Sequence, residues 1–163
     1  MKTGSICAIC AAALSLCLCS CSHSGGPKPC DIDENFSGDV TITQNEKTYS
    51  AKLSRGAADV WEMEFSKPDT VSGMKLELAD GSCTIEFSGL QYRLDRKDLP
   101  RYSMASLGCG AMEKLISKSD VSCKSEDGKL LESGVINGQD FTAVFEDDKI
   151  KELTVSDQLR FEF

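Results

Sequence analysis

Beyond its first 35 residues, the chain alternates apolar and polar residues through most of its length. In the segment WEMEF, for example, Trp61, Met63 and Phe65 are separated by two glutamates. A period of two residues is typical of β-strands that turn one face to the core and the other to solvent. Turn-forming pairs, Asp-Gly at 80–81 and Asn-Gly at 137–138, lie between successive runs. Such pairs favour antiparallel hairpins.

Residues 103–118, SMASLGCGAMEKLISK, follow a helical period instead. Their apolar residues fall on one stripe, Ser103 suits the N-cap and Lys118 suits the last turn. Two glycines inside the segment lower its helical propensity by about 1 kcal/mol each. The pattern therefore predicts an α+β fold, in which a curved antiparallel sheet of about eight strands forms a half-barrel that covers one inserted helix.

The amino-terminal residues follow neither period. Residues 1–5 carry a lysine, residues 6–19 form an unbroken apolar run, and the chain then becomes polar. As a helix, 14 residues at 1.5 Å each would span roughly 21 Å, which is less than the roughly 30 Å of a bilayer's hydrocarbon core. This order is typical of a secretory signal peptide rather than a membrane-spanning helix.

Residues 18–21, Leu-Cys-Ser-Cys, resemble the lipobox of bacterial lipoproteins, a leucine and two smallish residues before a cysteine. Cys17 and Cys19 each follow a bulky leucine, whereas Cys21 follows the small Ser20. The resemblance implies cleavage between Ser20 and Cys21 and a diacylglyceryl thioether on Cys21. Two acyl chains are enough for stable membrane attachment. The alternative is an ordinary secreted protein whose signal peptide is discarded whole.

Cleavage at this point would divide the chain into three parts. Residues 1–20 would be the removed signal peptide, residues 21–35 the lipidated cysteine with a flexible tether, and residues 36–163 the folded domain. The cysteines of the signal peptide then serve as apolar filler. Four cysteines remain besides the anchor, and if one disulfide forms, Cys109 and Cys123 are the candidate pair because they flank the helix exit.

Charge and composition exclude several classes of function. The formal net charge of −8 argues against a nucleic-acid partner, because phosphates require a basic surface. The one histidine, His23, falls in the tether, which removes most histidine-dependent catalysis. No G-x-S-x-G nucleophile motif occurs, and no C-x-x-C pair survives in the mature chain. We therefore expect a protein that is not an enzyme and that carries no cofactor and no metal.

Residues 36–163 also resemble the half-barrel lipoprotein carriers of the LolA/LolB type and their anchored relatives. The resemblance rests on the segments FSGDVTI, WEMEFSKPDTVSGMKLEL, TIEFSGLQYRL and SGVINGQDFTAVFEDDKIKELTV. Members of that family hold acyl chains or other apolar ligands against the concave face of the sheet. The carriers are soluble shuttles, whereas this chain is expected to be tethered, so the resemblance implies an anchored holder or acceptor.

The bulky residues of the predicted inner face are candidates to line a ligand site. The same side chains could instead pack against the helix. The predicted function is that of a membrane-anchored extracytoplasmic lipoprotein that binds or holds a lipid or other hydrophobic ligand. The alternative is a module that binds another envelope protein without a small ligand. The expected location is the outer face of the cell membrane, or the outer membrane in a cell that has two. The candidate lining residues are Trp61, Met63, Phe65, Met74, Leu76, Ile85, Phe87 and Phe145.

Overall fold

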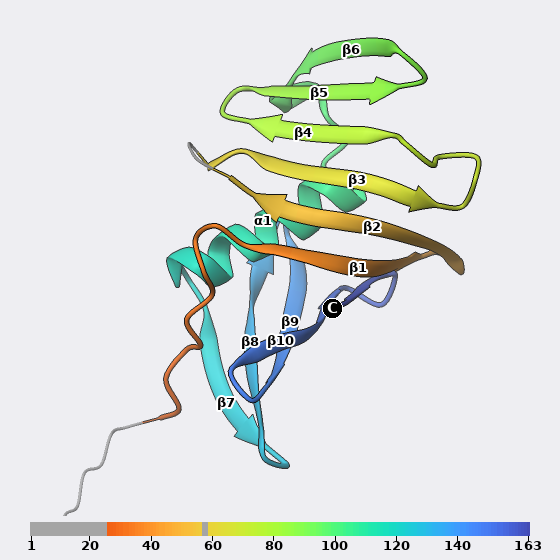
Figure 1. Cartoon of the computed structure of the whole chain (residues 1–163). Helices are drawn as coiled ribbons and strands as arrows, with labels where there is room; N and C mark the ends of the chain where they lie inside the picture. The colour runs from red at the N-terminus through yellow and green to blue at the C-terminus, as the bar shows by residue number, and fades with distance from the viewer. Residues whose placement is uncertain (1–25, 57–58) are drawn as a thin grey trace, which may run out of the picture.

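The computed structural model describes residues 26–56 and 59–163 (Figure 1). The predictions for Ser20 and Cys21 lie outside these residues. The described part contains eleven strands, one α-helix and a short 3-10 helix, η2 (Arg96–Asp98). The strands and α1 are β1 (Ser37–Gln44), β2 (Lys47–Arg55), β3 (Trp61–Lys67), β4 (Lys75–Ala79), β5 (Ser82–Phe87), β6 (Leu90–Asp95), α1 (Met104–Ser117), β7 (Ser122–Glu126), β8 (Lys129–Ile136), β9 (Gln139–Glu146), β10 (Lys149–Val155) and β11 (Leu159–Glu162).

All eleven strands belong to one antiparallel sheet, in the order β6-β5-β4-β3-β2-β1-β11-β10-β9-β8-β7. The last strand pairs with the first, and Phe161 on β11 lies opposite Ile42 on β1. Two meanders, β1–β6 and β7–β11, are therefore joined at their first and last strands. The helix α1 connects the two free edges of the sheet. Figure 1 shows the sheet bending around α1, which lies behind β1–β3 in this view.

The predicted α+β arrangement of a curved antiparallel sheet with one inserted helix is confirmed, but the predicted number of about eight strands is wrong. Among the missed strands, β7 (Ser122–Glu126) is an edge strand in which Cys123 alone is partly buried. An edge strand of this kind has little apolar alternation, because neither of its faces is well covered.

The hydrophobic core lies between α1 and the inner face of the sheet. Helix residues Leu107, Met112 and Leu115 are almost fully buried there. The helix approaches the sheet closely at Gly108, where an added Cβ would overlap the ring of Phe161. The sheet residues of this core include Val40, Ile42, Leu53, Trp61, Met63, Phe65, Phe141, Phe145, Leu153, Val155 and Phe161.

The ends of α1 agree closely with the sequence. The hydroxyl of Ser103 accepts a hydrogen bond from the backbone N–H of Ser106 at 3.2 Å, so Ser103 is the predicted N-cap. At the other end, Lys118 adopts a left-handed backbone conformation with φ of 53° and stops the helix. The prediction of a helix over residues 103–118 is therefore correct to within one residue at each end.

A carboxylate on α1 fixes the helix against β2 and β3. Arg55 donates from Nε to Oε2 of Glu113 and from Nη2 to Oε1, both at 3.0 Å. Trp61 donates from Nε1 to the same Oε2 at 3.0 Å. Burial alone would raise the pKa of Glu113, but the hydrogen bonds from Arg55 and Trp61 and the charge of Arg55 together hold that pKa below its ordinary value. Glu113 is thus ionised at neutral pH and sets the rotation of α1 about its axis.

The expectation of a flexible tether that extends to residue 35 is wrong from Cys30 onward. Cys30 is 8% exposed, and its backbone N–H donates to Oε1 of Glu132 at 2.5 Å. Asp31 forms an ion pair with Lys118. Arg55 donates from Nη1 to the carbonyl oxygen of Glu34 at 2.9 Å. These contacts hold residues 30–34 against the domain, and the buried backbone N–H of Cys30 finds its hydrogen-bond partner there.

Candidate functional site

The inner face of the sheet continues beyond the helix onto β4, β5 and β6. Across these strands Leu76 lies opposite Ile85, and Ile85 lies opposite Tyr92. Residues that face each other in antiparallel strands project from the same side of the sheet. We call the apolar residues on this side the β4–β6 apolar surface. They are Met74, Leu76, Ile85, Phe87, Leu90 and Tyr92.

Exposure rises steadily across the β4–β6 apolar surface. Met74, Leu76 and Ile85 are half-buried and pack against the core. Leu90 and Tyr92 are 77% and 67% exposed. Single exposed apolar residues are normal on a protein, whereas a contiguous group of them indicates a binding surface.

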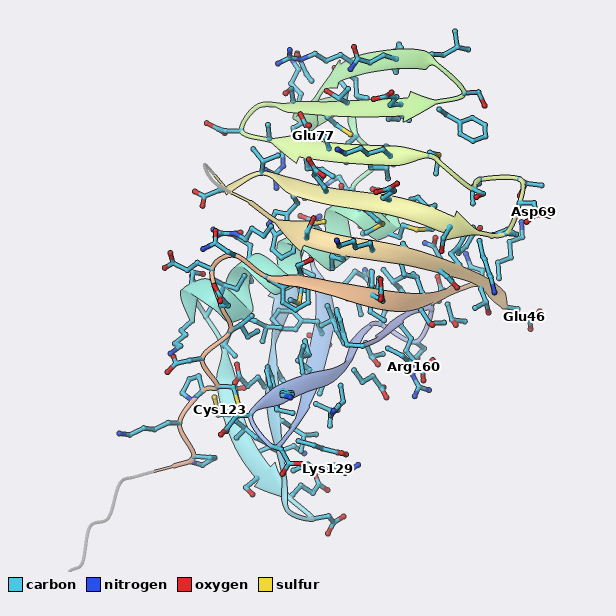
Figure 2. All side chains as sticks on the ribbon, in the orientation of Figure 1. Glu46, Asp69, Glu77, Cys123, Lys129 and Arg160 are labelled. Atoms are coloured by element: carbon cyan, nitrogen blue, oxygen red, sulfur yellow. The ribbon has the colours of Figure 1, made fainter. Side chains whose placement is uncertain are left out.

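The opposite side of the same three strands is polar. Its positions on β4–β6 are Lys75, Glu77, Thr84, Glu86, Gln91 and Arg93. Figure 2 labels Glu77 at one of these positions on β4. Lys75 Nζ lies 2.9 Å from Oε2 of Glu62 on the neighbouring strand β3. Water therefore solvates the outer side well and the inner side poorly. A hydrophobic molecule that covers the β4–β6 apolar surface would gain free energy, because apolar area is removed from water.

The structure divides the eight predicted lining residues into two groups. Trp61, Met63, Phe65 and Phe145 are at most 2% exposed and belong to the core, so for these four the expected ligand contact is wrong and the packing alternative holds. The physical reason is that α1 fills the concave side of this part of the sheet. The remaining four, Met74, Leu76, Ile85 and Phe87, all belong to the β4–β6 apolar surface.

Sequence reasoning missed two residues of this surface. Leu90 and Tyr92 alternate with polar residues in the sequence, but they are not among the predicted lining residues. The parity of LQYRL places them on the same face as Phe87 once the hairpin at Gly89 is recognised, since Phe87 and Leu90 are paired in the register of β5 and β6. The placement of these two residues on the inner face was therefore predictable from the sequence.

The four cysteines of the described part are free thiols, so the candidate pair Cys109–Cys123 is not bonded in the structure. Cys109 is buried within α1, and burial raises the pKa of its thiol to about 12. Cys123 is half-buried on β7. A thiol with so high a pKa is almost entirely protonated at neutral pH, which makes Cys109 a core residue and not a nucleophile.

Two further properties of the described residues bear on the site. No group of three or more histidine, cysteine, aspartate or glutamate side chains in residues 26–56 and 59–163 is arranged to hold a metal ion. In the same residues, no helix has the length and apolar character needed to cross a bilayer.

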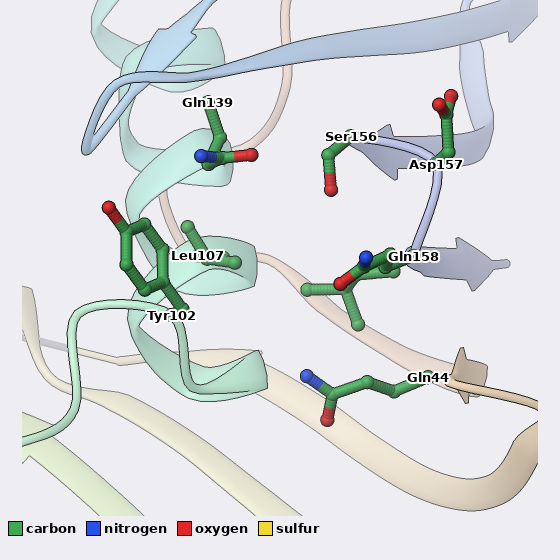
Figure 3. Close-up of a pocket in the computed structure, with 8 residues that line it drawn as sticks. Gln44, Tyr102, Leu107, Gln139, Ser156, Asp157 and Gln158 are labelled. Atoms are coloured by element: carbon green, nitrogen blue, oxygen red, sulfur yellow. The ribbon is translucent and has the colours of Figure 1, made fainter.

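A separate pocket of about 400 Å³ opens near the start of α1, beside the turns that join β1 to β2 and β10 to β11 (Figure 3). In Figure 3, the side chains of Gln139, Ser156 and Gln158 are directed into the space opposite the helix. Only two lining residues, Leu107 and Leu159, are aliphatic. Amide groups lose free energy when they are covered without a hydrogen-bond partner, so this pocket is poorly suited to an apolar molecule. Its lining is Gln44, Tyr102, Leu107, Gln139, Ser156, Asp157, Gln158 and Leu159.

Comparisons with known proteins give distant structural similarities. No protein-family model matches the chain, and no curated protein matches its sequence. An uncharacterized conserved protein from Thermus thermophilus is similar in structure, with a TM-score of 0.48 and 11% identity, over 76% of this chain and 73% of that chain. A LolA superfamily protein from Nitrosomonas europaea has a TM-score of 0.37 and 10% identity, over 77% of this chain and 66% of that chain. At TM-scores below 0.5, neither similarity identifies the ligand of this chain.

Proposed function

We propose that this protein is a membrane-anchored extracytoplasmic lipoprotein of LolA-like architecture, which holds a lipid or other hydrophobic molecule on its β4–β6 apolar surface. The observation that carries the proposal is the exposure of Phe87, Leu90 and Tyr92 on the face that elsewhere forms the core. These side chains project from the inner face of the sheet, and α1 does not extend over them. The proposal requires no cofactor, no metal and no nucleic acid.

Burial of apolar area supplies the free energy for such binding. At about 25 cal/mol per Å², covering about 200 Å² of apolar surface would contribute about 5 kcal/mol before the costs of association. The half-buried Met74 adds an adaptable side chain at the inner end of the surface. A shallow, one-sided surface of this kind favours reversible holding of a molecule over its permanent enclosure.

The proposed anchor would keep this surface near the membrane. Because the chain is docked on the domain from Cys30 onward, only residues 22–29 separate Cys21 from the folded part. Eight residues span at most about 28 Å when fully extended. The domain would then remain within about one bilayer thickness of the membrane surface, where apolar molecules can be exchanged.

Binding of the uncharged fluorescent probe N-phenyl-1-naphthylamine tests the proposed surface. The protein is the chain from residue 21 onward with Cys21→Ser, so that no attached acyl chain competes for the site. We expect the wild-type surface to bind the probe, and the double variant Leu90→Asp/Tyr92→Asp to bind it at least about tenfold more weakly. Both residues are largely exposed, so the substitutions leave the core intact.

The matched control is Gln91→Asp, which places one aspartate, half of the added charge, on the same strand but on its polar side. We expect its probe affinity to equal that of the wild type. Equal binding by the wild type and by the double variant would show that the probe binds elsewhere, and absence of binding by the wild type would contradict the proposed function.

One observation favours a second function, in which another envelope protein binds this region. The strand β6 is an edge of the described sheet and pairs only with β5, so one row of its backbone N–H and C=O groups is available for strand addition. A wild-type protein that fails to bind the probe, yet captures an envelope protein that Gln91→Pro no longer captures, would favour this alternative.

A further inference from the structure

A pocket of about 360 Å³ lies between η2, α1 and the turn that joins β8 to β9. Three of its lining residues are cationic and none is acidic, although the chain as a whole has a formal charge of −8. Clustered charges of one sign in a recess attract ions of the opposite sign. The lining consists of Arg96, Lys97, Leu99, Arg101, Ser106, Gly110, Ile136 and Asn137.

The two arginines of this pocket have no acidic partner among the described residues, and Arg96 donates from Nη1 only to the carbonyl oxygen of Ala79, at 3.5 Å. Lys97 Nζ lies 3.2 Å from Oδ2 of Asp95, and both side chains are exposed. Arg96 and Arg101 form no ion pair with another described residue. Asp98 belongs to the same segment but does not line the pocket. A guanidinium group without an acidic partner can donate two parallel hydrogen bonds to two oxygens of a phosphate or carboxylate.

Two hydrogen bonds, one between backbone groups and one from a side chain to the backbone, hold the cationic segment in place. The N–H of Arg96 donates to the carbonyl oxygen of Gly81 at 3.0 Å, which ties η2 to the turn between β4 and β5. Asn137 donates from Nδ2 to the carbonyl oxygen of Arg101 at 2.9 Å, which ties the segment to the turn after β8. The positions from which the cations project are thus set before an anion arrives, and this lowers the entropy cost of binding.

The cationic pocket and the β4–β6 apolar surface lie on the same side of the sheet. Ser106 and Gly110 line the pocket from α1, which packs on the inner face. On β6, the residues of that face are Leu90, Tyr92 and then Leu94, over a strand length of about 13 Å. Leu94 and Leu99 are both half-buried against the core and continue the apolar path toward Arg96.

We infer that the molecule held by this protein is an anionic amphiphile. Its tail lies along the β4–β6 apolar surface, and its phosphate or carboxylate headgroup binds Arg96, Lys97 and Arg101. The inference rests on the proposed function for the tail and adds the chemistry of the head. A neutral amphiphile with the same tail would leave the guanidinium groups without an anion and would bind more weakly.

Displacement of bound N-phenyl-1-naphthylamine by matched ligands tests the inference. Dodecyl phosphate and dodecanol share one tail and differ in headgroup charge, and inorganic phosphate supplies the anion without a tail. We expect dodecyl phosphate to displace the probe at about tenfold lower concentration than dodecanol. In Arg96→Gln/Arg101→Gln this preference should disappear while dodecanol still displaces the probe. Arg93→Gln, on the polar side of β6, is the matched control and should keep the preference.

The outcomes separate the headgroup from the tail. Equal displacement by the two dodecyl ligands in the wild type would overturn the inferred headgroup site and leave the proposed function standing. Persistence of the preference in the double variant would also overturn it. Inhibition of dodecyl phosphate binding by an equal concentration of inorganic phosphate would indicate a site for a free anion, and not for an amphiphile. If the probe itself does not bind, the proposed function fails first.

Discussion

At the scale of single residues, Glu132 is the most unusual group in the core. Its side chain is fully buried on the inner face of β8. Oε1 accepts the backbone N–H of Cys30, while Oε2 has no hydrogen-bond partner among the described residues. Burial raises the pKa of Glu132 above its ordinary value, and the hydrogen bond from Cys30 only partly opposes this. The ionised carboxylate therefore works against folding.

The direction of the pKa shift determines how stability depends on pH. The folded state holds its proton to higher pH than the unfolded chain, whose Glu132 titrates near 4.5. Glu132 therefore contributes favourably to the free energy of unfolding below pH 4.5. This contribution is lost as the pH rises through the higher pKa that Glu132 has in the folded state. We expect Glu132→Gln to be more stable than the wild type at neutral pH by about 1–2 kcal/mol, since the amide oxygen still accepts from Cys30.

Urea denaturation at neutral and at mildly acidic pH measures this effect. The gain from Glu132→Gln should shrink toward acidic pH, where the wild-type carboxyl is protonated. Glu126→Gln, on the neighbouring exposed edge strand, is the control and should change the free energy of unfolding by less than about 0.5 kcal/mol. A Glu132→Gln protein that is less stable than the wild type at neutral pH would contradict the account.

Sequence alone could not reveal the state of Glu132. A glutamate that follows an apolar residue in a strand is normally assigned to the solvent side, and Cys30 lies about a hundred positions earlier. Burial arises because the segment around Cys30 folds back over β8. Leu90 and Tyr92 are the opposite case, since their side of the strand follows from parity and hairpin register alone.

At the scale of elements, α1 was the most predictable part of the structure. Its apolar stripe and its cap at Ser103 are local signals, and local signals fix where a helix begins and ends. The role of Gly108 was not predictable. Helical propensity alone marks this glycine as a weakness, whereas in the structure it permits the close approach of α1 to Phe161 on β11. That contact joins residues more than 50 positions apart.

We expect Gly108→Ala to destabilise the protein by about 1–3 kcal/mol, although alanine is the better helix former. The Phe161 ring is fully buried, and an added Cβ at Gly108 would overlap its Cζ, so the ring or the helix must shift. Gly56→Ala is the control, because an added Cβ at Gly56 meets no atom of residues 26–56 and 59–163 within 4 Å. Chemical denaturation of both variants measures the difference, and a Gly108→Ala protein as stable as the wild type would refute the packing argument.

At the scale of the whole molecule, the curved antiparallel sheet and its inserted helix followed from the sequence, but the closure of the sheet did not. Alternation predicts that strands exist, and hairpin turns predict which consecutive strands pair. The pairing of β1 with β11 joins the first and last strands of the domain, and no local sequence pattern predicts it. The extent of the free apolar surface depends on this closure, because it determines which part of the sheet α1 covers.

The most direct test of the central proposal is native mass spectrometry of the full-length protein recovered from the membrane fraction of a bacterial host. We expect a polypeptide that begins at Cys21 with a covalent diacylglyceryl mass, together with an apolar molecule that is released on denaturation. In Leu90→Asp/Tyr92→Asp the covalent mass should remain and the released molecule should be absent. A chain without acyl mass on Cys21, or a wild-type protein that carries no bound molecule, would contradict the account.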